Sequence, residues 1–93
     1  MGLQFEWDHV KAAANRKKHR VSFDEAETDF GDPGEQTIFD EDHSEDEHRF
    51  ISLGMSNRGR VLVVSCTERG DRIRIISARV ANKLVRRQYE EAK

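Results

Sequence analysis

The pattern of apolar and polar residues in the second half of the chain is typical of β-strands. Strand-forming runs cover residues 49–56, 60–67 and 72–78, and the last of these begins with alternating arginine and isoleucine. Short turns at residues 57–59 and 69–71 join the three runs. Because links of this length reverse the chain direction, the pattern predicts an antiparallel sheet of three consecutive strands.

The first half predicts one short strand and two helices. Residues 3–7 alternate as a strand, and Asp8 then fits the N-cap of a helix over residues 9–19. The run Ser22-Phe23-Asp24-Glu25 is a capping box, which predicts a second helix as far as about Phe30. We expect both helices to pack on one face of the sheet through a shared set of small and aromatic side chains: Val10, Ala14, Phe23, Ala26 and Phe30.

Three further segments complete the predicted order. Residues 37–39 are a short β-prone run, and residues 40–48 contain six acids and no apolar residue, which is typical of a solvated loop. Residues 80–91 have a helical pattern, with four side chains directed at the sheet: Val80, Leu84, Val85 and Tyr89. The order is therefore β-α-α-β-β-β-β-α, and we expect an α+β fold in a single domain over residues 1–93.

Charge is distributed unevenly along the chain. Residues 1–48 hold 5 Lys and Arg against 14 Asp and Glu, a net charge of −9, whereas residues 49–93 hold 11 against 4, a net charge of +7. The total of −2 argues against a protein that coats DNA non-specifically. We therefore expect the basic half to bind an anionic ligand, and the acidic half to shield that site or to bind a basic partner.

Arginines in the third strand of the predicted sheet define the chemistry of the basic half. Arg72 and Arg74 lie two residues apart, so a regular strand places both on one face, and Arg79 follows just beyond the predicted strand end. A guanidinium group stays charged and matches phosphate with two parallel hydrogen bonds. The arrangement favours a nucleic acid as ligand, although an arginine on an exposed strand face is often only a solvated charge.

Cysteine content and hydropathy indicate a reducing compartment. Cys66 is the one cysteine, and its position in an apolar run favours core packing over a nucleophilic role. The sequence has no recognisable signal peptide and no apolar stretch of about 18 residues. We therefore expect a cytoplasmic protein that makes no contact with a membrane.

The acidic segment at residues 40–48 raises the question of a metal site, because carboxylates and the imidazoles of His43 and His48 bind divalent ions. Their order matches neither an EF-hand loop nor a zinc ribbon. We therefore expect no metal and no other cofactor. A loop that repels nucleic acid, or that meets a basic segment of a partner, fits this composition better.

Several short motifs follow one another along nearly the whole chain. They are Phe5-Glu6-Trp7-Asp8 with Lys11 and Asn15, Lys18-His19 with Val21 and Phe23, Asp42-His43-Ser44 with Glu47 and Arg49, Gly54, the run from Arg72 to Ala81, and Tyr89. In this order and spacing they resemble the BrnT family of bacterial toxins. The resemblance implies a RelE-like fold, in which an antiparallel sheet carries two N-terminal helices and a C-terminal helix.

The same resemblance implies an activity and a partner. It points to the toxin of a type II toxin–antitoxin system, a metal-independent endoribonuclease that cleaves RNA and inhibits translation and growth. The partner it implies is a BrnA-type antitoxin with a ribbon-helix-helix DNA-binding part, so that the toxin meets DNA only through the antitoxin. We expect a heterotetramer in which an antitoxin dimer bridges two toxins.

Cleavage of RNA without a metal needs a base, an acid and cations. The 2′-hydroxyl attacks its own phosphate, and the cations hold the doubly charged transition state. We assign the cationic role to Arg74 and Arg79, with Arg49 as a third arm. Proton transfer then falls to Glu47 or to His19, whose unperturbed pKa suits it best. We also expect three more residues to contact RNA: Lys18, Arg72 and Tyr89. Of these, Lys18 and Tyr89 could also assist proton transfer.

Structural roles stay open for several of these residues. His19 can act as a C-terminal cap of the first helix, and Glu47 can form a structural pair with Arg49. The family usually has a glutamate where this chain has Val85, and a polar or basic residue where it has Leu84. This departure favours an alternative function, a non-catalytic module of the same fold that binds RNA or the antitoxin.

Overall fold

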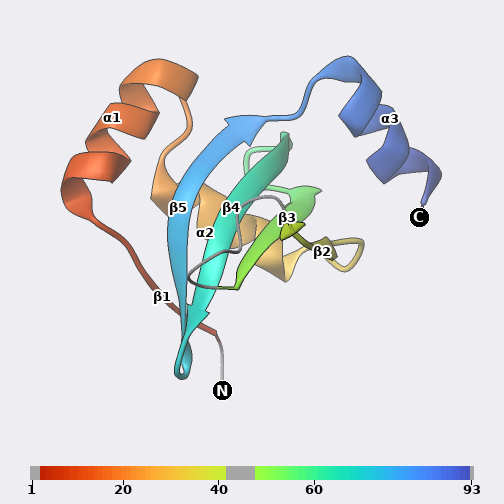
Figure 1. Cartoon of the computed structure of the whole chain (residues 1–93). Helices are drawn as coiled ribbons and strands as arrows, with labels where there is room; N and C mark the ends of the chain where they lie inside the picture. Colours follow the sequence, from red (N-terminus) through yellow and green to blue (C-terminus); the bar gives the residue numbers. More distant parts are fainter. Residues whose placement is uncertain (1–2, 42–47, 93) are drawn as a thin grey trace.

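The structure is a computed structural model that describes residues 3–41 and 48–92. Within these ranges the chain has an α+β fold, a five-stranded sheet with three α-helices and one 3-10 turn (Figure 1). The order of strands and helices agrees with the one predicted from the sequence. The elements are β1 (Gln4–Glu6), α1 (His9–His19), α2 (Phe23–Thr28), η1 (Asp29–Gly31), β2 (Gln36–Phe39), β3 (Arg49–Met55), β4 (Val61–Arg69), β5 (Arg72–Val80) and α3 (Lys83–Glu91).

The strands lie in the order β1-β5-β4-β3-β2. Strands β3, β4 and β5 form the antiparallel meander that the short turns predict, and β2 pairs antiparallel with β3. Strand β1 instead runs parallel to β5, so the sheet is mixed, and the expectation of a purely antiparallel sheet was wrong. Parallel neighbours cannot be joined by a tight turn, and here two helices and three strands lie between β1 and β5 in the chain.

Both N-terminal helices begin where the capping residues predict. Asp8 Oδ1 accepts from the amide of Val10 at 3.0 Å, and Ser22 Oγ accepts from the amide of Glu25 at 3.0 Å. The side chain of Glu25 bonds Arg60 rather than completing the capping box, because a partner from β4 is within reach. Helix α2 is also shorter than predicted, since it ends at Thr28 and the chain continues as a 3-10 turn.

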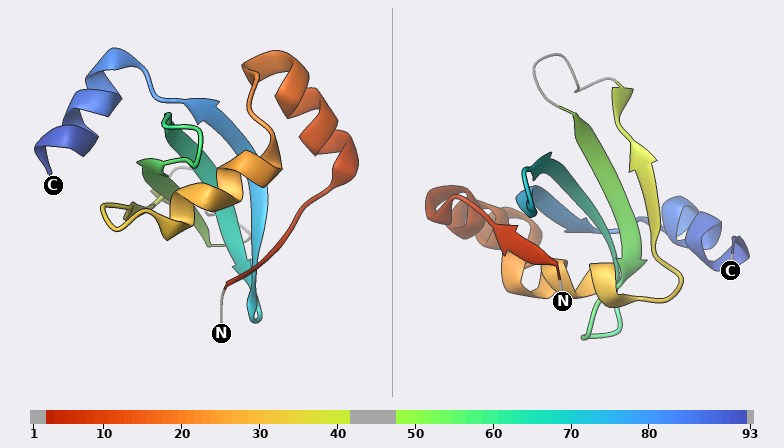
Figure 2. Two further views of the ribbon diagram at one scale, coloured as in Figure 1. Left: turned by 180° about the vertical axis from the view of Figure 1, so that it is seen from behind. Right: turned by 90° about the horizontal axis from the view of Figure 1, so that it is seen from below.

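Helices α1 and α2 cover one side of the sheet, which we name the helix face (Figure 2). Phe23 and Ala26 are buried there against Leu62, Val64 and neighbouring residues, as expected for α2. The main core of the protein therefore lies between α2 and the strands β4 and β5.

Helix α1 packs through a face that its apolar residues did not predict. Val10 is 77% exposed and Ala14 is exposed, so their expected packing on the sheet was wrong. The side of α1 toward the sheet carries Ala12, Asn15 and His19, three or four residues apart. Hydrogen bonds from the buried Asn15 side chain outweigh the weak apolar stripe in deciding this orientation.

Helix α3 lies on the opposite side of the sheet and covers only one end of it (Figure 2). Tyr89 is fully buried and packs with Leu53 and Val61. Leu84 is 66% exposed, and Val80 is the last residue of β5, so two of the four predicted packing contacts of this helix were wrong. The helix begins only at Lys83, after Asn82 caps it. The rest of this side, which we name the open face, carries the candidate site.

A buried carboxyl group joins η1 to β3. Asp29 is fully buried, and Gly54 permits the close approach because a Cβ there would lie 2.7 Å from the Asp29 carbonyl oxygen. Ser52 Oγ lies 2.6 Å from both Asp29 Oδ1 and Glu35 Oε2. A hydroxyl has a single proton to donate, so one of these carboxyl groups must be protonated, and the fully buried Asp29 is the less costly one.

We expect the free energy of unfolding to fall as the pH rises from about 4 to about 7. Burial, together with the nearby charges of Glu35 and Asp32, raises the pKa of Asp29 from 3.8 to about 7. In this window the folded chain keeps a proton that the unfolded chain has released. Stability from this group is therefore complete below pH 3.8 and declines by up to about 1.4 kcal/mol per pH unit until the folded pKa is passed.

Urea unfolding at pH values from about 4.5 to about 7.5 measures this dependence. Asp29→Asn should flatten the profile, because an amide mimics the protonated acid. Asp24→Asn is the matched control on the exposed side of α2 and should keep the slope of the parent protein. An Asp29→Asn protein with the parental slope would contradict the assignment.

Candidate active site

A cavity of about 280 Å³ lies on the open face, at the end that α3 leaves uncovered. It collects side chains from α1, from the segment after β2, and from the three central strands. The residues that line it are His19, Asp40, Arg49, Ile51, Val63, Ser65, Ile76, Ser77, Ala78 and Arg79. The sequence suggested eight catalytic and RNA-contact residues, and the structure describes seven of them. Three of the seven line the cavity: His19, Arg49 and Arg79.

A bulge in β5 shapes the floor of the cavity. Ser65 pairs with Ser77 and Cys66 pairs with Ile75, so Ile76 is an extra residue in β5. Ile76 and Ser77 both line the cavity, although neighbouring residues of a regular strand point to opposite faces. The bulge thus adds a side chain to the cavity. It also shifts the alternation of the strand, so that the residues of β5 after Ile76 point to the opposite faces from those of a regular strand.

The phase change decides which arginines share a face. Arg74 and Arg79 are five residues apart, an odd spacing that would place them on opposite faces of a regular strand. With the extra residue between them, Arg74 pairs with Thr67 and Arg79 pairs with Val63, two β4 residues that lie on the same face. Arg79 also lies within β5 rather than beyond its end, which corrects the expectation from sequence.

Arg49 and Arg79 flank the central strand β4 from its two sides. Arg49 is the first residue of β3 and pairs with Thr67, and Arg79 pairs with Val63. Ser65 lies between these two positions on β4 and lines the same cavity. Two guanidinium groups and a hydroxyl therefore border one hollow, an arrangement that suits a phosphate with several acceptor oxygens.

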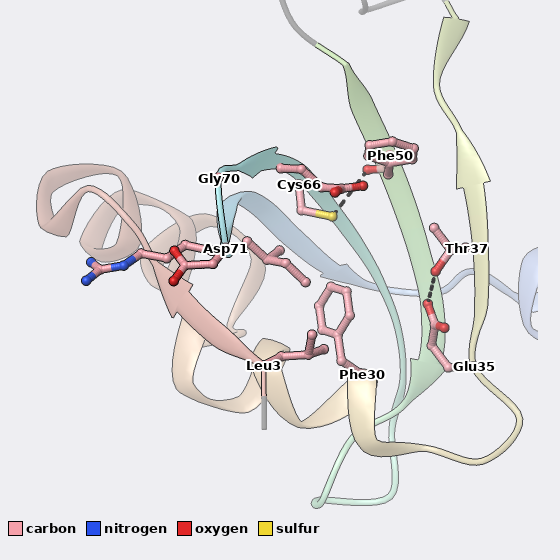
Figure 3. A pocket seen from close by; sticks show the side chains of 11 residues that line it. Leu3, Phe30, Glu35, Thr37, Phe50, Cys66, Gly70 and Asp71 are labelled. Carbon is pink, nitrogen blue, oxygen red and sulfur yellow. Dashed lines mark hydrogen bonds between the residues drawn. The ribbon is translucent and has the colours of Figure 1, made fainter. Parts of the chain in front are cut away.

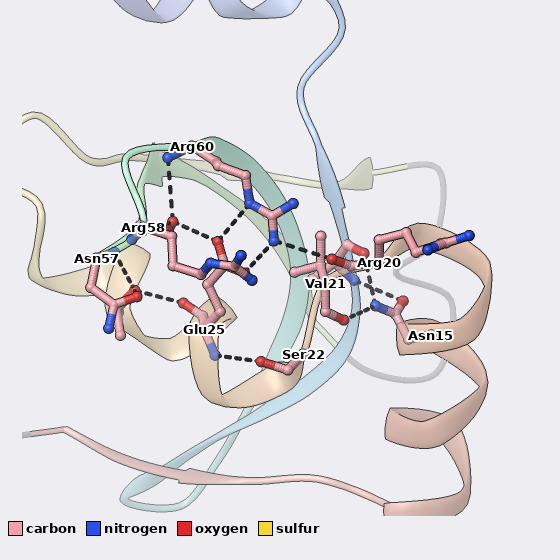
Figure 4. Close-up of polar contacts among 11 residues, drawn as sticks. Asn15, Arg20, Val21, Ser22, Glu25, Asn57, Arg58 and Arg60 are labelled. Atoms are coloured by element: carbon pink, nitrogen blue, oxygen red, sulfur yellow. Dashed lines mark hydrogen bonds and ion pairs between the residues drawn. The ribbon is translucent and has the colours of Figure 1, made fainter.

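Asn15 fastens α1 to the strand that carries Arg79. Its Nδ2 donates to the carbonyl oxygens of Val21 at 3.0 Å and Ala78 at 2.9 Å, and its Oδ1 accepts from the amide of Ala78 at 3.1 Å. Figure 4 shows this side chain pointing from α1 toward the start of α2. Because Ala78 precedes Arg79, these bonds set the position of His19 on α1 relative to the arginine.

A partly buried ion pair between Arg60 and Glu25 holds the C-terminal end of α1 from the other side (Figure 4). Arg60 Nε donates to Glu25 Oε2 at 3.0 Å, a second bond joins its Nη2 to Oε1, and the same Nη2 donates to the carbonyl oxygen of Arg20 at 3.1 Å. Ser56 Oγ donates to Glu25 Oε2 at 2.7 Å. These hydrogen bonds, chiefly from Arg60, lower the pKa of Glu25 below its usual value.

Asp40 and Asn15 are the residues that sequence reasoning missed. Asp40 lines the cavity, and its amide donates to the carbonyl oxygen of Arg49 at 2.8 Å. Its position at the start of the acidic segment led us to treat it as part of a solvated loop. Pairing of β2 with β3 brings it to the site, and this pairing has no signal in the local sequence around Asp40.

The other suggested site residues that the structure describes do not line the cavity. Arg74 is on the same face, where its Nη1 donates to Glu6 Oε2 at 2.9 Å. Lys18 is exposed beside His19, and Glu47 lies outside the described residues. Arg72 is exposed and lies 3.9 Å from Glu6 Oε1.

Tyr89 has a packing role instead of the suggested RNA contact. It is fully buried, and its hydroxyl donates to Asp32 Oδ2. Val85 packs against the same cluster, and neither it nor Leu84 lines the cavity. The departure of these two residues from the family pattern therefore affects the packing and surface of α3 rather than the site.

A second cavity, of about 380 Å³, lies on the helix face and has mostly apolar walls, with Leu3, Phe30 and Phe50 among them (Figure 3). Cys66 lines it and donates from Sγ to the Phe50 carbonyl oxygen at 3.7 Å. Burial raises the pKa of this thiol to about 12, so it stays protonated. Cys66 is thus a buried packing residue, as predicted, in an environment that does not stabilise a thiolate.

The described residues offer neither a metal site nor a membrane-spanning helix. Within residues 3–41 and 48–92, no group of three or more His, Cys, Asp or Glu is arranged to hold a metal ion. In the same ranges, no helix has the length and apolar character needed to span a membrane.

Comparison with known proteins identifies the family. The family model described as the ribonuclease toxin BrnT of type II toxin–antitoxin systems matches residues 7–84. The crystal structure of the Brucella abortus ribonuclease toxin BrnT is similar, with a TM-score of 0.67 and 20% sequence identity over 88% of this chain and 100% of that chain. At this identity the likeness shows the fold alone, and comparison with curated protein sequences found no match. Because the family model covers most of the chain and agrees with the motifs in the sequence, the protein belongs to the BrnT family of ribonuclease toxins of type II toxin–antitoxin systems.

Proposed function

We propose that this toxin is a metal-independent endoribonuclease whose active site is the cavity on the open face. The observation that carries the proposal is the composition of that cavity, where Arg49 and Arg79 flank a hollow that His19 and Asp40 also line. Two fixed cations can bind a phosphate, and two groups with different proton affinities can move protons. Cleavage of cellular RNA by this site would inhibit translation and stop growth.

The cleavage step uses the RNA itself as nucleophile. One of the two titratable groups removes the proton of the 2′-hydroxyl, and the 2′-oxygen forms a bond to the adjacent phosphorus. The bond from phosphorus to the 5′-oxygen of the next nucleotide breaks, and the other group protonates that oxygen. The products are a 2′,3′-cyclic phosphate end and a 5′-hydroxyl end.

The chemistry of the lining residues assigns a role to each. A carboxylate such as Asp40 can serve as the base, and His19 can serve as the acid when it is protonated. Arg49 and Arg79 stabilise the extra negative charge that develops on the phosphate oxygens. Among the residues suggested by sequence, Arg74, Arg72 and Lys18 are proposed to contact RNA outside the cavity, and Glu47 remains a second candidate for proton transfer.

We propose that the partner is a BrnA-type antitoxin with a ribbon-helix-helix part and that two toxins and two antitoxins form a heterotetramer in the cytoplasm. Membership of a type II system supports a protein antitoxin. The five-stranded sheet flanked by helices supports a RelE-like relationship of the fold. An antitoxin that covers Arg49 and Arg79 would block RNA from the cavity, and the toxin would meet DNA only through the antitoxin.

Incubation of the purified protein with RNA in the presence of EDTA tests the proposed function. We expect cleavage to continue, to leave 2′,3′-cyclic phosphate ends, and to stop when the cleaved nucleotide carries a 2′-deoxyribose. The antitoxin encoded beside the toxin should suppress cleavage when it is added in equal amount. Cleavage of the 2′-deoxy substrate at the parental rate would rule out the proposed nucleophile, and loss of activity in EDTA would rule out metal independence.

A further inference from the structure

A second surface of α1 has a composition suited to a polyanion. A hollow of about 700 Å³, which we name the α1 groove, is lined by Ala13, Arg16, Lys17, Arg20 and Arg58. Four of these described residues are cationic and none is acidic. The four from α1 and its C-cap follow the spacing i, i+3, i+4 and i+7, which places them on one side of the helix. This spacing usually marks the apolar face that packs on a core, but here it carries three positive charges.

Apart from the negative end of the α1 dipole, the described fold gives these charges no partner. The side of α1 toward the sheet is formed by other residues, Ala12, Asn15 and His19, so the groove faces away from the core. Within residues 3–41 and 48–92, the side chains of Arg16, Lys17 and Arg20 have no recorded hydrogen bond or ion pair, and all three are exposed.

Arg58 reaches the groove from the turn between β3 and β4. Because it lies outside α1, its presence there is not explained by the dipole of that helix. Its Nη1 lies 3.8 Å from Glu25 Oε1, while the closer bonds of that carboxylate go to Arg60. Figure 4 shows Arg60 between Arg58 and Arg20. The partly buried ion pair thus connects two walls of the groove, the turn and the end of α1.

The backbone of Arg20 is an independent indication that this side chain has a use. Arg20 has φ +61° and ψ +30°, the left-handed conformation that ends a helix and that glycine adopts with least strain. A residue with a Cβ is strained in that conformation. The structural tasks of this position are carried out by its main chain, whose amide donates to Arg16 O and whose carbonyl accepts from Arg60. A glycine would perform both, so the fold alone does not account for an arginine.

The groove and the proposed active site both reach the C-terminal end of α1. His19 lines the cavity on the open face and the next residue, Arg20, lines the groove. The two hollows therefore share this helix end as a border. An RNA strand with one phosphate between Arg49 and Arg79 can pass over this end and place its neighbouring phosphates in the groove.

We propose that the α1 groove is an RNA subsite that binds the backbone of nucleotides beyond the cleaved one. The proposal rests on the proposed function, and it assigns a substrate class, single-stranded RNA longer than the site of cleavage. Contacts from Lys and Arg to phosphate carry no sequence information, so the groove adds affinity without base preference.

The test compares the binding of a long RNA, which can reach the groove, with the cleavage of a short RNA, which cannot. We compare Arg16→Glu/Lys17→Glu with the matched control Lys11→Glu/Lys83→Glu, which reverses two exposed charges outside the groove and has the same net charge. Binding is measured with an uncleavable 2′-O-methyl RNA of about 20 nucleotides at several salt concentrations. Cleavage is measured with dinucleoside monophosphates, which fill only the active-site cavity.

We expect the groove variant to bind the long RNA about tenfold or more weakly than the control. The slope of the logarithm of the binding constant against the logarithm of the salt concentration should become shallower by about 0.7 for each lost phosphate contact. Both proteins should cleave dinucleotides at the parental rate. Arg20→Gly should also weaken RNA binding while its urea midpoint does not fall, because glycine relieves the backbone strain.

Several results would overturn the proposal. Equal affinity of the groove variant and the control for long RNA would show that the groove binds no RNA. Unchanged RNA affinity with weakened binding of the antitoxin would assign the groove to that partner instead. Failure of the parent protein to cleave any RNA would remove the proposed active site, but the uncleavable RNA would still report whether the groove binds.

Discussion

Arg79→Ala is expected to lower the rate of RNA cleavage by about 10²–10³-fold while the protein stays folded. Arg79 lines the proposed active site, and its guanidinium supplies a positioned charge to the phosphate oxygens in the transition state. Its side chain is exposed, so its loss removes charge but little packing. The rate is measured on purified protein with a saturating RNA substrate, and circular dichroism reports the fold.

Two further variants sharpen this test. Arg79→Lys keeps the charge but lacks the planar fork, so it should recover little activity if bidentate binding of phosphate is the reason for arginine. Arg72→Ala is the matched control on the same strand. Because Arg72 lies outside the cavity, its loss should weaken RNA binding at most and leave the rate at saturating RNA unchanged. A folded Arg79→Ala protein that cleaves at the parental rate would move the catalytic site elsewhere.

Asn15→Ala is expected to lower the free energy of unfolding by about 3 kcal/mol. The substitution removes three hydrogen bonds to main-chain groups of Val21 and Ala78 and leaves those groups without their partner in a buried environment. For a chain of this length such a loss corresponds to a decrease in Tm of roughly 10–20 °C. Urea and thermal unfolding measure both quantities.

The same substitution should also affect activity below the unfolding transition. Asn15 holds the main chain beside Arg79 and joins it to the helix that carries His19. We therefore expect a reduced cleavage rate even where the variant is fully folded. Asn57→Ala, at an exposed turn, is the matched control and should change neither stability nor activity by much. If Asn15→Ala unfolds at the same urea concentration as that control, the hydrogen bonds do not stabilise the fold as described.

The local sequence was sufficient to predict most helices and strands because their signals are short-range. Asp8 and Ser22 cap the two N-terminal helices through amides two and three residues away. The turns at residues 57–59 and 69–71 are short enough to permit only antiparallel pairing of the strands they join. The family motifs then identified the toxin family, and Arg49, Arg79 and His19 do line one cavity.

Other features depended on contacts between distant segments, which local patterns do not record. The parallel pairing of β1 with β5, and the arrival of Asp40 at the cavity through β2, join parts of the chain that have no common motif. The orientation of α1 is an example with a clear energetic reason. Its apolar stripe is weak, so the hydrogen bonds of one buried amide, Asn15, decide which side faces the sheet.

The sequence by itself determined the order of the elements, the family and the identity of the two arginines at the cavity. Only the tertiary structure decided that Arg49 and Arg79 converge, because both are placed by the pairing of their strands with β4. One extra residue, Ile76, sets the face on which Arg79 lies, because a single inserted residue reverses the alternation of every later side chain in a strand. The bulge forms where β5 pairs with β4, and so the geometry of the site depends on long-range pairing that the pattern of arginines and isoleucines does not contain.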